Sequence, residues 1–534
     1  MRSALKNPDL VYQRRWLTLL VLCISLIVIT LDNTILNVAI PTLAHTKSQG
    51  GLGATASQLQ WIVDAYTLVF AGLLLTAGSL GDRFGRYRFL AIGLSIFGIG
   101  SLLSAFAPSA NALIGTRALM GIGAAFIMPS TLSIITNVFT NPAERGKAIG
   151  VWAGVSALGI GLGPITGGFL LEHFWWGSIF IVNVPIVIIG LVLGFMLVPE
   201  SSDPSHSALD PVGAVLSIVA LGSILWAVIE APAHGWGAPE IIAGFVFGFV
   251  VLGIFLTWEL RSSHPMLDMR FFENPRFSAA SGAITLVFLS LFGTLFLLTQ
   301  YLQSVLGYST VEAGAVLLPQ AAILMIFAPL SNVWVQKFGN KLVVAVGLLL
   351  VAASFVLFLT WDASTGVGTV IAVTALMGLG MANVLAPCTD SIMGSLPRAK
   401  AGVGSAVNDT TRQMGGAVGV AVFGSLMASH FHSTIQHKIG SRVPGSLFAQ
   451  VRDNVGTAVG IAKQSPAARP YSNTIITAAH DTFVSGLHQI GLVAAAITVF
   501  AAIGVALFLP ARARDNEPVP AVGAEPEPEP VGAV

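Results

Sequence analysis

Charged side chains are scarce in this chain of 534 residues. Asp, Glu, Lys and Arg together account for 10% of the sequence, whereas soluble domains contain roughly 25%. Hydrophobic residues reach 54%, and the mean hydropathy is +0.81. Because so few charges cannot solvate a globular surface of this size, the composition excludes a soluble protein and favours one embedded in a membrane. The formal net charge of +1 gives no reason to expect a nucleic-acid partner.

Several signatures of chemistry are also missing. The chain has 2 cysteines, Cys23 and Cys388, and both fall in apolar runs, which excludes an extracellular disulfide framework. The histidines lack the spacing of metal ligands. No GxxxxGK[ST] phosphate-binding loop occurs, because the Gly-Lys pair at 146–147 is followed by alanine. We therefore expect no enzymatic activity, no metal, no cofactor and no use of ATP.

Long apolar runs are what the sequence contains in abundance. A bilayer is crossed by about 20 apolar residues in a helix, and hydrocarbon leaves backbone groups no partner outside the helix. The chain is therefore predicted to be an all-α membrane protein with 14 transmembrane helices. The expected spans are 16–40, 59–80, 89–107, 111–134, 147–171, 178–198, 209–230, 240–260, 277–302, 312–335, 341–361, 368–396, 400–428 and 486–509.

Lysine and arginine predict the orientation of these spans. The short loops on the side of the N-terminus contain most of them, including Arg83, Arg86, Arg145 and Arg398, whereas the short loops on the other side contain only Lys47. Cytoplasmic loops carry such an excess of positive charge. We expect a multi-pass protein of the cell membrane with both termini in the cytoplasm.

An internal repeat predicts the architecture. Residues 118–123 read ALMGIG and residues 375–380 read ALMGLG, and 375 − 118 gives an offset of 257. The glycines at 159, 163 and 168 recur at 415, 419 and 424, where 415 − 159 gives an offset of 256. The paired spans run in the same direction, which indicates a parallel repeat. The expected units are two six-helix bundles at 1–200 and 266–510, with an inserted helical hairpin at 201–265.

Two segments stand apart from the expected spans. Residues 429–485 form an outer loop, within which 445–463 has the apolar spacing of an amphipathic helix, with Leu447, Val451, Val455 and Val459 on one face. Residues 511–534 are rich in Pro, Glu, Ala and Val, which is typical of a disordered tail.

The loop between the second and third spans carries a motif. Residues 78–88 read GSLGDRFGRYR. Gly81 and Gly85 permit a tight turn there, and Asp82 is placed to accept hydrogen bonds from a nearby helix end. The run resembles the signature G-x-L-A/G-D-R-x-G-R-R/K of the major facilitator superfamily. That resemblance implies that the loop gates movement between the two halves, with the gating residues Gly78, Gly81, Asp82, Arg83, Gly85 and Arg86.

Further runs resemble the fourteen-span drug:proton antiporter branch of that superfamily. They are LDNTILNVAIP at 31–41, WIVDAY at 61–66, GIGLGPITGG at 159–168, WWGSIFIVNVP at 175–185 and NDTTRQMGG at 408–416. The resemblance implies a bacterial inner-membrane exporter driven by the proton gradient. In such antiporters the fifth-span motif, here Gly159, Gly163, Pro164, Gly167 and Gly168, is associated with blocking leak and setting the direction of export.

Ionisable residues within the spans are the candidate coupling site. From the expected span ends, Asp32, Asp64 and Arg117 lie about 12, 8 and 9 Å deep, close to one level. Burying such groups in a membrane costs at least roughly 2.5–3.5 kcal/mol, so each is a functional candidate. Asp409 is a further candidate, although its spacing from Arg412 also suits a structural ion pair.

These residues lead to a functional prediction with alternatives. Burial disfavours a charged carboxylate and a nearby cation favours it, so Asp32 is expected to alternate between a proton and a cationic guest. The leading function is a proton-coupled antiporter, working as a monomer among membrane lipids, that exports amphipathic and mainly cationic drugs. A dedicated exporter of one lipid, peptide or metabolite remains open. So does a receptor or assembly factor that keeps the fold without transport.

Overall fold

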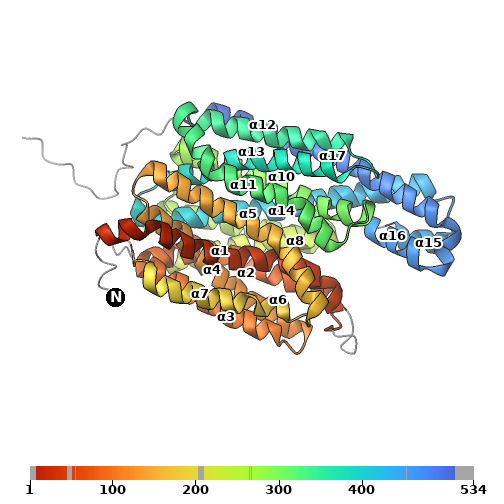
Figure 1. Cartoon of the computed structure of the whole chain (residues 1–534), viewed down its shortest axis with the longest axis horizontal. Coiled ribbons are helices and arrows are strands. Elements are labelled where there is room, and N and C mark those ends of the chain that lie inside the picture. The colour runs from red at the N-terminus through yellow and green to blue at the C-terminus, as the bar shows by residue number, and fades with distance from the viewer. Residues whose placement is uncertain are drawn as a thin grey trace, which may run out of the picture.

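The computed structural model describes residues 8–44, 51–54, 56–202, 210–263, 265, 267–452 and 454–510. Within them it contains 14 helical spans that are long and apolar enough to cross a membrane, arranged as a bundle of long helices side by side (Figure 1). The all-α prediction and its 14 spans are therefore confirmed. The tail predicted at 511–534 lies outside the described residues.

Thirteen of the spans are built on one long helix each, and the sixth combines the short α6 with α7. Before the hairpin, the helices are α1 (Pro8–Ala44), α2 (Ala56–Phe84), α3 (Arg86–Ala105), α4 (Ala110–Val138), α5 (Pro142–His173), α6 (Ser178–Ile181) and α7 (Asn183–Leu197). The hairpin is α8 (Pro211–His234) and α9 (Pro239–Arg261). After it come α10 (Pro275–Gln300), α11 (Thr310–Phe338), α12 (Asn340–Leu357), α13 (Val367–Gly394), α14 (Ala401–Ile439) and α17 (Ser472–Phe508).

Equivalent glycines pack equivalent helices in the two halves, which we call the N-terminal half (α1–α7) and the C-terminal half (α10–α17). A Cβ at Gly121 of α4 would lie 2.6 Å from the Tyr66 carbonyl of α2, and one at Gly378 of α13 would lie 2.7 Å from the Gln320 carbonyl of α11. Gly123 and Gly380 similarly face α3 and α12. The repeated motif is therefore a contact between backbones that leaves no room for a side chain.

The inserted hairpin packs on the seam between the halves. Helix α8 contacts both α2 and α14; a Cβ at Gly72 of α2 would lie 3.9 Å from the Ile218 carbonyl, and the Trp236 indole donates to Ser425 of α14 at 2.8 Å. Helix α9 packs mainly on α8, and its Phe247 and Phe249 side chains are exposed. This apolar outer face is suited to lipid.

The segment predicted as an outer loop is helical along most of its length. Helix α14 continues to Ile439 and α17 begins at Ser472, and between them lie α15 (Gly445–Val451) and α16 (Val455–Gln464), which project beyond one end of the bundle (Figure 1). The single amphipathic helix expected at 445–463 is therefore wrong. Asn454 begins a new helix because its side chain accepts from the Thr457 N–H at 2.8 Å. The four apolar residues of the expected face, Leu447, Val451, Val455 and Val459, are nevertheless all buried.

Candidate functional site

Asp32 and Arg117 form a buried ion pair inside the N-terminal half. The Nη1 of Arg117 on α4 lies 2.5 Å from the Asp32 Oδ2 on α1, and the two side chains are 1% and 0% exposed. The Arg117 Nε also donates to the Ile62 carbonyl of α2 at 3.1 Å, and its guanidinium lies 4.4 Å from the centroid of the Tyr66 ring. The structure thus brings together two of the residues that the sequence placed at one level.

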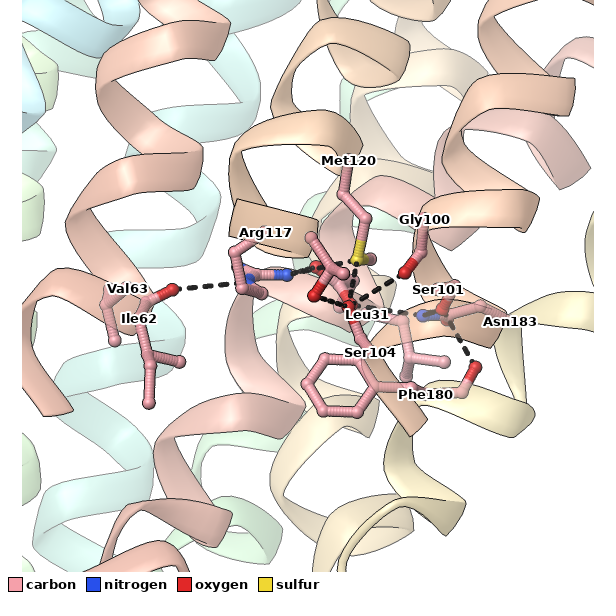
Figure 2. A network of polar contacts seen from close by, with 12 residues as sticks. Leu31, Ile62, Val63, Gly100, Ser101, Ser104, Arg117, Met120, Phe180 and Asn183 are labelled. Atoms are coloured by element: carbon pink, nitrogen blue, oxygen red, sulfur yellow. Dashed lines mark hydrogen bonds and ion pairs between the residues drawn. The ribbon is translucent and has the colours of Figure 1, made fainter. Parts of the chain in front are cut away.

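Asn183 completes the hydrogen bonding of this carboxylate. Its Nδ2 donates to the Asp32 Oδ1 and to the Ser101 Oγ, both at 3.0 Å, and Ser101 donates to the Phe180 carbonyl at 2.9 Å (Figure 2). The sixth span is broken between α6 and α7, so Asn183 is the first residue of α7. The break brings the Asn183 amide to the buried acid.

Asp64 occupies a different environment from Asp32. It is half-buried on α2, two residues after Ile62, whose carbonyl accepts from Arg117. The described contacts of Arg117 reach α2 through the Ile62 carbonyl and the Tyr66 ring. Of the three residues predicted at one level, Asp32 and Arg117 are directly paired, and Asp64 lies on α2 between the two residues that contact Arg117.

We predict that Asn183→Ala destabilises the protein and slows efflux, because it leaves the Asp32 Oδ1 without the donor seen here. A buried acceptor deprived of its donor costs about 1–3 kcal/mol. Thermal unfolding in detergent and ethidium efflux from cells are the measurements. The control is Asn111→Ala, which removes the acceptor of an exposed amide–amide hydrogen bond and should change neither. If Asn183→Ala unfolds at the parent's temperature and exports ethidium at the parent's rate, neither stability nor efflux depends on the hydrogen bond from Asn183 to Asp32.

The glycine run of the fifth span lies between two helices. A Cβ at Gly159 or Gly163 would collide with the hydroxyls of Thr30 and Thr34 on α1, and one at Gly167 would lie 2.9 Å from the Ile35 side chain. On the other side, a Cβ at Gly314 of α11 would lie 2.9 Å from the Cβ of Pro164, and one at Gly168 would meet Val311 at 2.5 Å. The motif thus joins α1, which carries Asp32, to a helix of the C-terminal half.

The loop predicted to gate is hydrogen-bonded across the two halves. The Asp82 carboxylate accepts from the Gly402 N–H at 2.9 Å and the Val403 N–H at 3.1 Å, in the first turn of α14. Arg86 donates to Asp82 at 2.8 Å and to the Arg398 carbonyl at 2.7 Å. A carboxylate at a helix N-terminus is stabilised by the helix dipole. The end of the bundle that carries residues 81–86, predicted to be cytoplasmic, is therefore closed.

Gly81 and Gly85 have different roles. Gly85 has φ +120° and separates α2 from α3, so a turn there does require glycine. Gly81 lies within α2, which runs to Phe84, so the turn expected at Gly81 is wrong. Arg83 is half-buried at the end of α2, and its guanidinium lies 5.3 Å from the centroid of the Phe84 ring.

Glu200 fixes the turn from the end of the sixth span. It accepts from the Tyr87 N–H at 3.0 Å, and a Cβ at Gly85 would lie 2.8 Å from its Oε1. Burial raises the pKa of the Glu200 carboxyl, against the effect of the backbone hydrogen bonds and of nearby Arg88. The first turn of α3 is thus held by an acid that the sequence reasoning did not identify.

A second set of contacts closes the same end between α5 and the C-terminal half. Arg145 pairs with Asp390 of α13 at 2.9 Å, and Asn332 of α11 donates to the Ala143 carbonyl at 2.6 Å. Arg398 also donates to the Thr140 carbonyl at 3.0 Å. Asp390 is therefore an interface residue.

Asp409 and Arg412 lie on α14 and are both buried. Asp409 accepts from Asn408 at 3.2 Å, and Arg412 donates to Thr389 at 2.8 Å. Among the ion pairs of the described chain none joins Asp409 to Arg412, so the pair offered by their spacing is not formed. The guanidinium instead lies 5.1 Å from the centroid of the Trp152 ring on α5.

The contacts missed by sequence reasoning are mostly polar neighbours from distant spans. Asn183 and Ser101 are uncharged, so neither stands out within an apolar run, although Asn183 lies in a quoted motif. Glu200 is charged but follows the end of the predicted sixth span, so it was not a buried charge in the sequence. Within the described ranges, no group of three or more His, Cys, Asp and Glu side chains is placed to hold a metal ion.

Two repeated halves of membrane-spanning helices, with an ion pair buried inside one half and a loop hydrogen-bonded across the halves, are the arrangement of a membrane transporter. Residues 22–420 match the Major Facilitator Superfamily, and the chain belongs to this family of transporters, which are not enzymes. It is similar to the multidrug efflux pump LfrA of Mycolicibacterium smegmatis, with 38% identity over 92% of this chain and 96% of the relative. The methyl viologen resistance protein SmvA of Salmonella typhimurium is 36% identical over 88% and 93%, respectively.

Solved structures agree on the fold. The human organic anion transporter MFSD10 superposes with a TM-score of 0.58 at 16% identity, over 92% of this chain and 99% of that one. The similarity to the efflux pumps above, and not this fold match, places the chain among multi-pass membrane transporters of the multidrug efflux family.

Proposed function

We propose that this chain is a proton-coupled antiporter that exports amphipathic, mainly cationic compounds by alternating access. It would work as a monomer in the bacterial inner membrane, with both termini in the cytoplasm and the proton gradient as its energy source. The observation that carries the proposal is the Asp32–Arg117 pair, whose side chains are buried and lie on two candidate membrane spans. Burial disfavours the charged form of a carboxylate and a nearby cation favours it, so a rearrangement of such a pair changes which form is preferred.

Protonation of Asp32 would be transmitted along α1. When Asp32 becomes neutral, Arg117 loses its counter-charge and keeps the Ile62 carbonyl and the Tyr66 ring, which it already contacts. The opposite face of α1 packs on the glycines of α5 through Thr30 and Thr34. Since α5 also packs on α11, a change at Asp32 can alter how the halves meet.

In the proposed cycle, the bonds at the end that carries residues 81–86 belong to a state that is closed to the cytoplasm. Asp82 holds the end of α2 against the start of α14, and Arg86 holds the start of α3 to the Arg398 carbonyl. Breaking these bonds would open the cytoplasmic end to cargo. We place Asp64 on the path by which outer protons reach Asp32. Asp64 is half-buried and lies closer to the start of α2 than to its end, and the start of α2 is on the side opposite the predicted cytoplasmic end.

The cargo is inferred from chemistry and from the relatives. One relative is named for resistance to methyl viologen, which is a flat dication, and another is named a multidrug pump. In this chain, Asp32 is bonded on both oxygens inside the N-terminal half, so direct contact with a cargo cation would require this network to open. Asp409, which has one oxygen without a hydrogen-bond partner in the described chain, is the better candidate to attract a cation.

The test is transport by purified protein in proteoliposomes under an imposed pH gradient. Uptake of ethidium and methyl viologen should follow the gradient and stop when an ionophore removes both the pH difference and the voltage. Uphill transport that ignores both would refute antiport. A preference for a neutral or anionic compound would favour the dedicated exporter, and no flux of any compound would favour a receptor.

A further inference from the structure

The guanidinium of Arg412 lies against aromatic rings from both halves. Its Cζ is 5.1 Å from the ring centroid of Trp152 on α5 and 5.3 Å from that of Phe288 on α10. Such distances are those of cation–π contacts, which strengthen when water is excluded. Arg412 is only 7% exposed and Trp152 is fully buried, so this aromatic pair holds a cation in a dry environment.

Arg412 and its neighbouring acid are each incompletely bonded. The Arg412 Nε and the Asp409 Oδ2 are buried, and neither has a hydrogen-bond partner among the described residues. The two residues are one helical turn apart, a spacing at which opposite charges can pair. Buried polar atoms normally have partners, and a movement of the Arg412 side chain toward Asp409 would supply one to each of these atoms.

The aromatic pair is located where a transporter binds its cargo. Trp152 lies about 15 Å along α5 from Pro142, and Arg412 about 16 Å along α14 from Ala401; both helix starts are at the end predicted to be cytoplasmic. Substrate sites of such transporters lie near the midplane, between the repeats. The Trp152 indole is itself fixed, because its N–H donates to Thr131 at 3.1 Å. A rigid ring of one half thus faces a ring and a movable cation of the other.

We propose that Trp152 and Phe288 form the binding site for planar cationic cargo, and that Arg412 occupies this site as a tethered substitute when no cargo is bound. A flat cation that enters between the halves replaces the guanidinium at the rings. The displaced Arg412 then pairs with Asp409. This inference rests on the cationic cargo of the proposed function and identifies its aromatic site.

If Arg412 competes with cargo for the rings, substitutions of Trp152 and of Arg412 should change the affinity for cargo in opposite directions. Trp152→Leu removes a ring and should weaken ethidium binding by about five- to thirtyfold. Arg412→Gln removes the competitor and should strengthen binding by a similar factor. Arg412→Lys keeps a cation and should lie between the parent and Arg412→Gln. Equilibrium dialysis of ethidium and methyl viologen with purified protein, without a gradient, is the measurement.

The double variant Trp152→Leu/Arg412→Gln distinguishes two reasons why Arg412→Gln could strengthen binding: release of the aromatic rings, or removal of a positive charge that repels the cargo. If Arg412 competes for the rings, Arg412→Gln should give little gain in a Trp152→Leu background. An equal gain in both backgrounds, an unchanged affinity or a loss in Arg412→Gln would each overturn the proposal. If Trp152→Leu does not fold, Phe288→Leu replaces it, because Phe288 is half-buried.

The same assay keeps this proposal distinct from antiport. Binding without a gradient does not depend on proton coupling. If the variants change the affinity as expected but transport does not depend on the gradient, antiport is refuted and the aromatic site is not. A parent protein that binds neither ethidium nor methyl viologen would refute the aromatic site, whereas proton-driven export of a neutral compound would still support antiport.

Discussion

Asp32→Asn is expected to reduce pH-driven efflux of ethidium to the background of empty vesicles. Asparagine keeps the shape and the acceptor oxygen for Asn183, but it neither binds nor releases a proton in the relevant range. The ion pair with Arg117 is also lost. Breaking one partner of a buried pair typically costs about 3–5 kcal/mol, so the folded state must be checked by thermal unfolding alongside proteoliposome transport.

The double variant Asp32→Asn/Arg117→Gln separates coupling from folding. It removes both buried charges, so it should recover much of the stability lost in the single variant while transport stays at background. Glu240→Gln, which removes an exposed carboxylate at the start of α9, is the matched control and should transport as the parent does. Gradient-driven efflux at the parent rate in either Asp32 variant would show that Asp32 does not couple the proton.

The sequence identified Asp32 and Arg117 because an ionisable residue in an apolar run is conspicuous by itself. It did not identify Asn183, because an amide in a membrane helix carries no such signal and its approach to Asp32 depends on the break between α6 and α7. In the same way, Asp82 was expected to accept from a helix end, but only the arrangement of the halves shows that the end belongs to α14.

Helix ends were less predictable than spans for a physical reason. Hydropathy reports the part of a helix that lies in hydrocarbon, whereas hydrogen bonding decides where the helix stops. Helix α14 therefore passes 428, the predicted end of its span, and reaches Ile439, and α17 begins at Ser472, ahead of 486. The glycine repeat was more informative, because a contact that excludes a side chain leaves the same residue in both halves.

Gly78→Ala is expected to open the predicted cytoplasmic end and abolish transport. A Cβ at Gly78 would lie 2.8 Å from the Ala406 Cβ and would also collide with the Gly402 carbonyl oxygen, which is backbone and cannot turn aside. Overpacking of this kind costs about 1–3 kcal/mol, and each 1.4 kcal/mol is about tenfold in an equilibrium. The closed state should therefore lose about five- to 150-fold in population relative to the open one.

Spin labels on exposed positions 88 and 342 of α3 and α12, in a background lacking Cys23 and Cys388, would report this shift. The distance between the labels should lengthen in Gly78→Ala and remain that of the parent in Gly72→Ala, where a Cβ would have only an ordinary contact of 3.9 Å. Both substitutions are on α2 and remove the same flexibility of glycine, so they differ mainly in the collision with α14. An unchanged distance in Gly78→Ala, with transport intact, would mean that close approach of α2 and α14 is not needed to shut the gate.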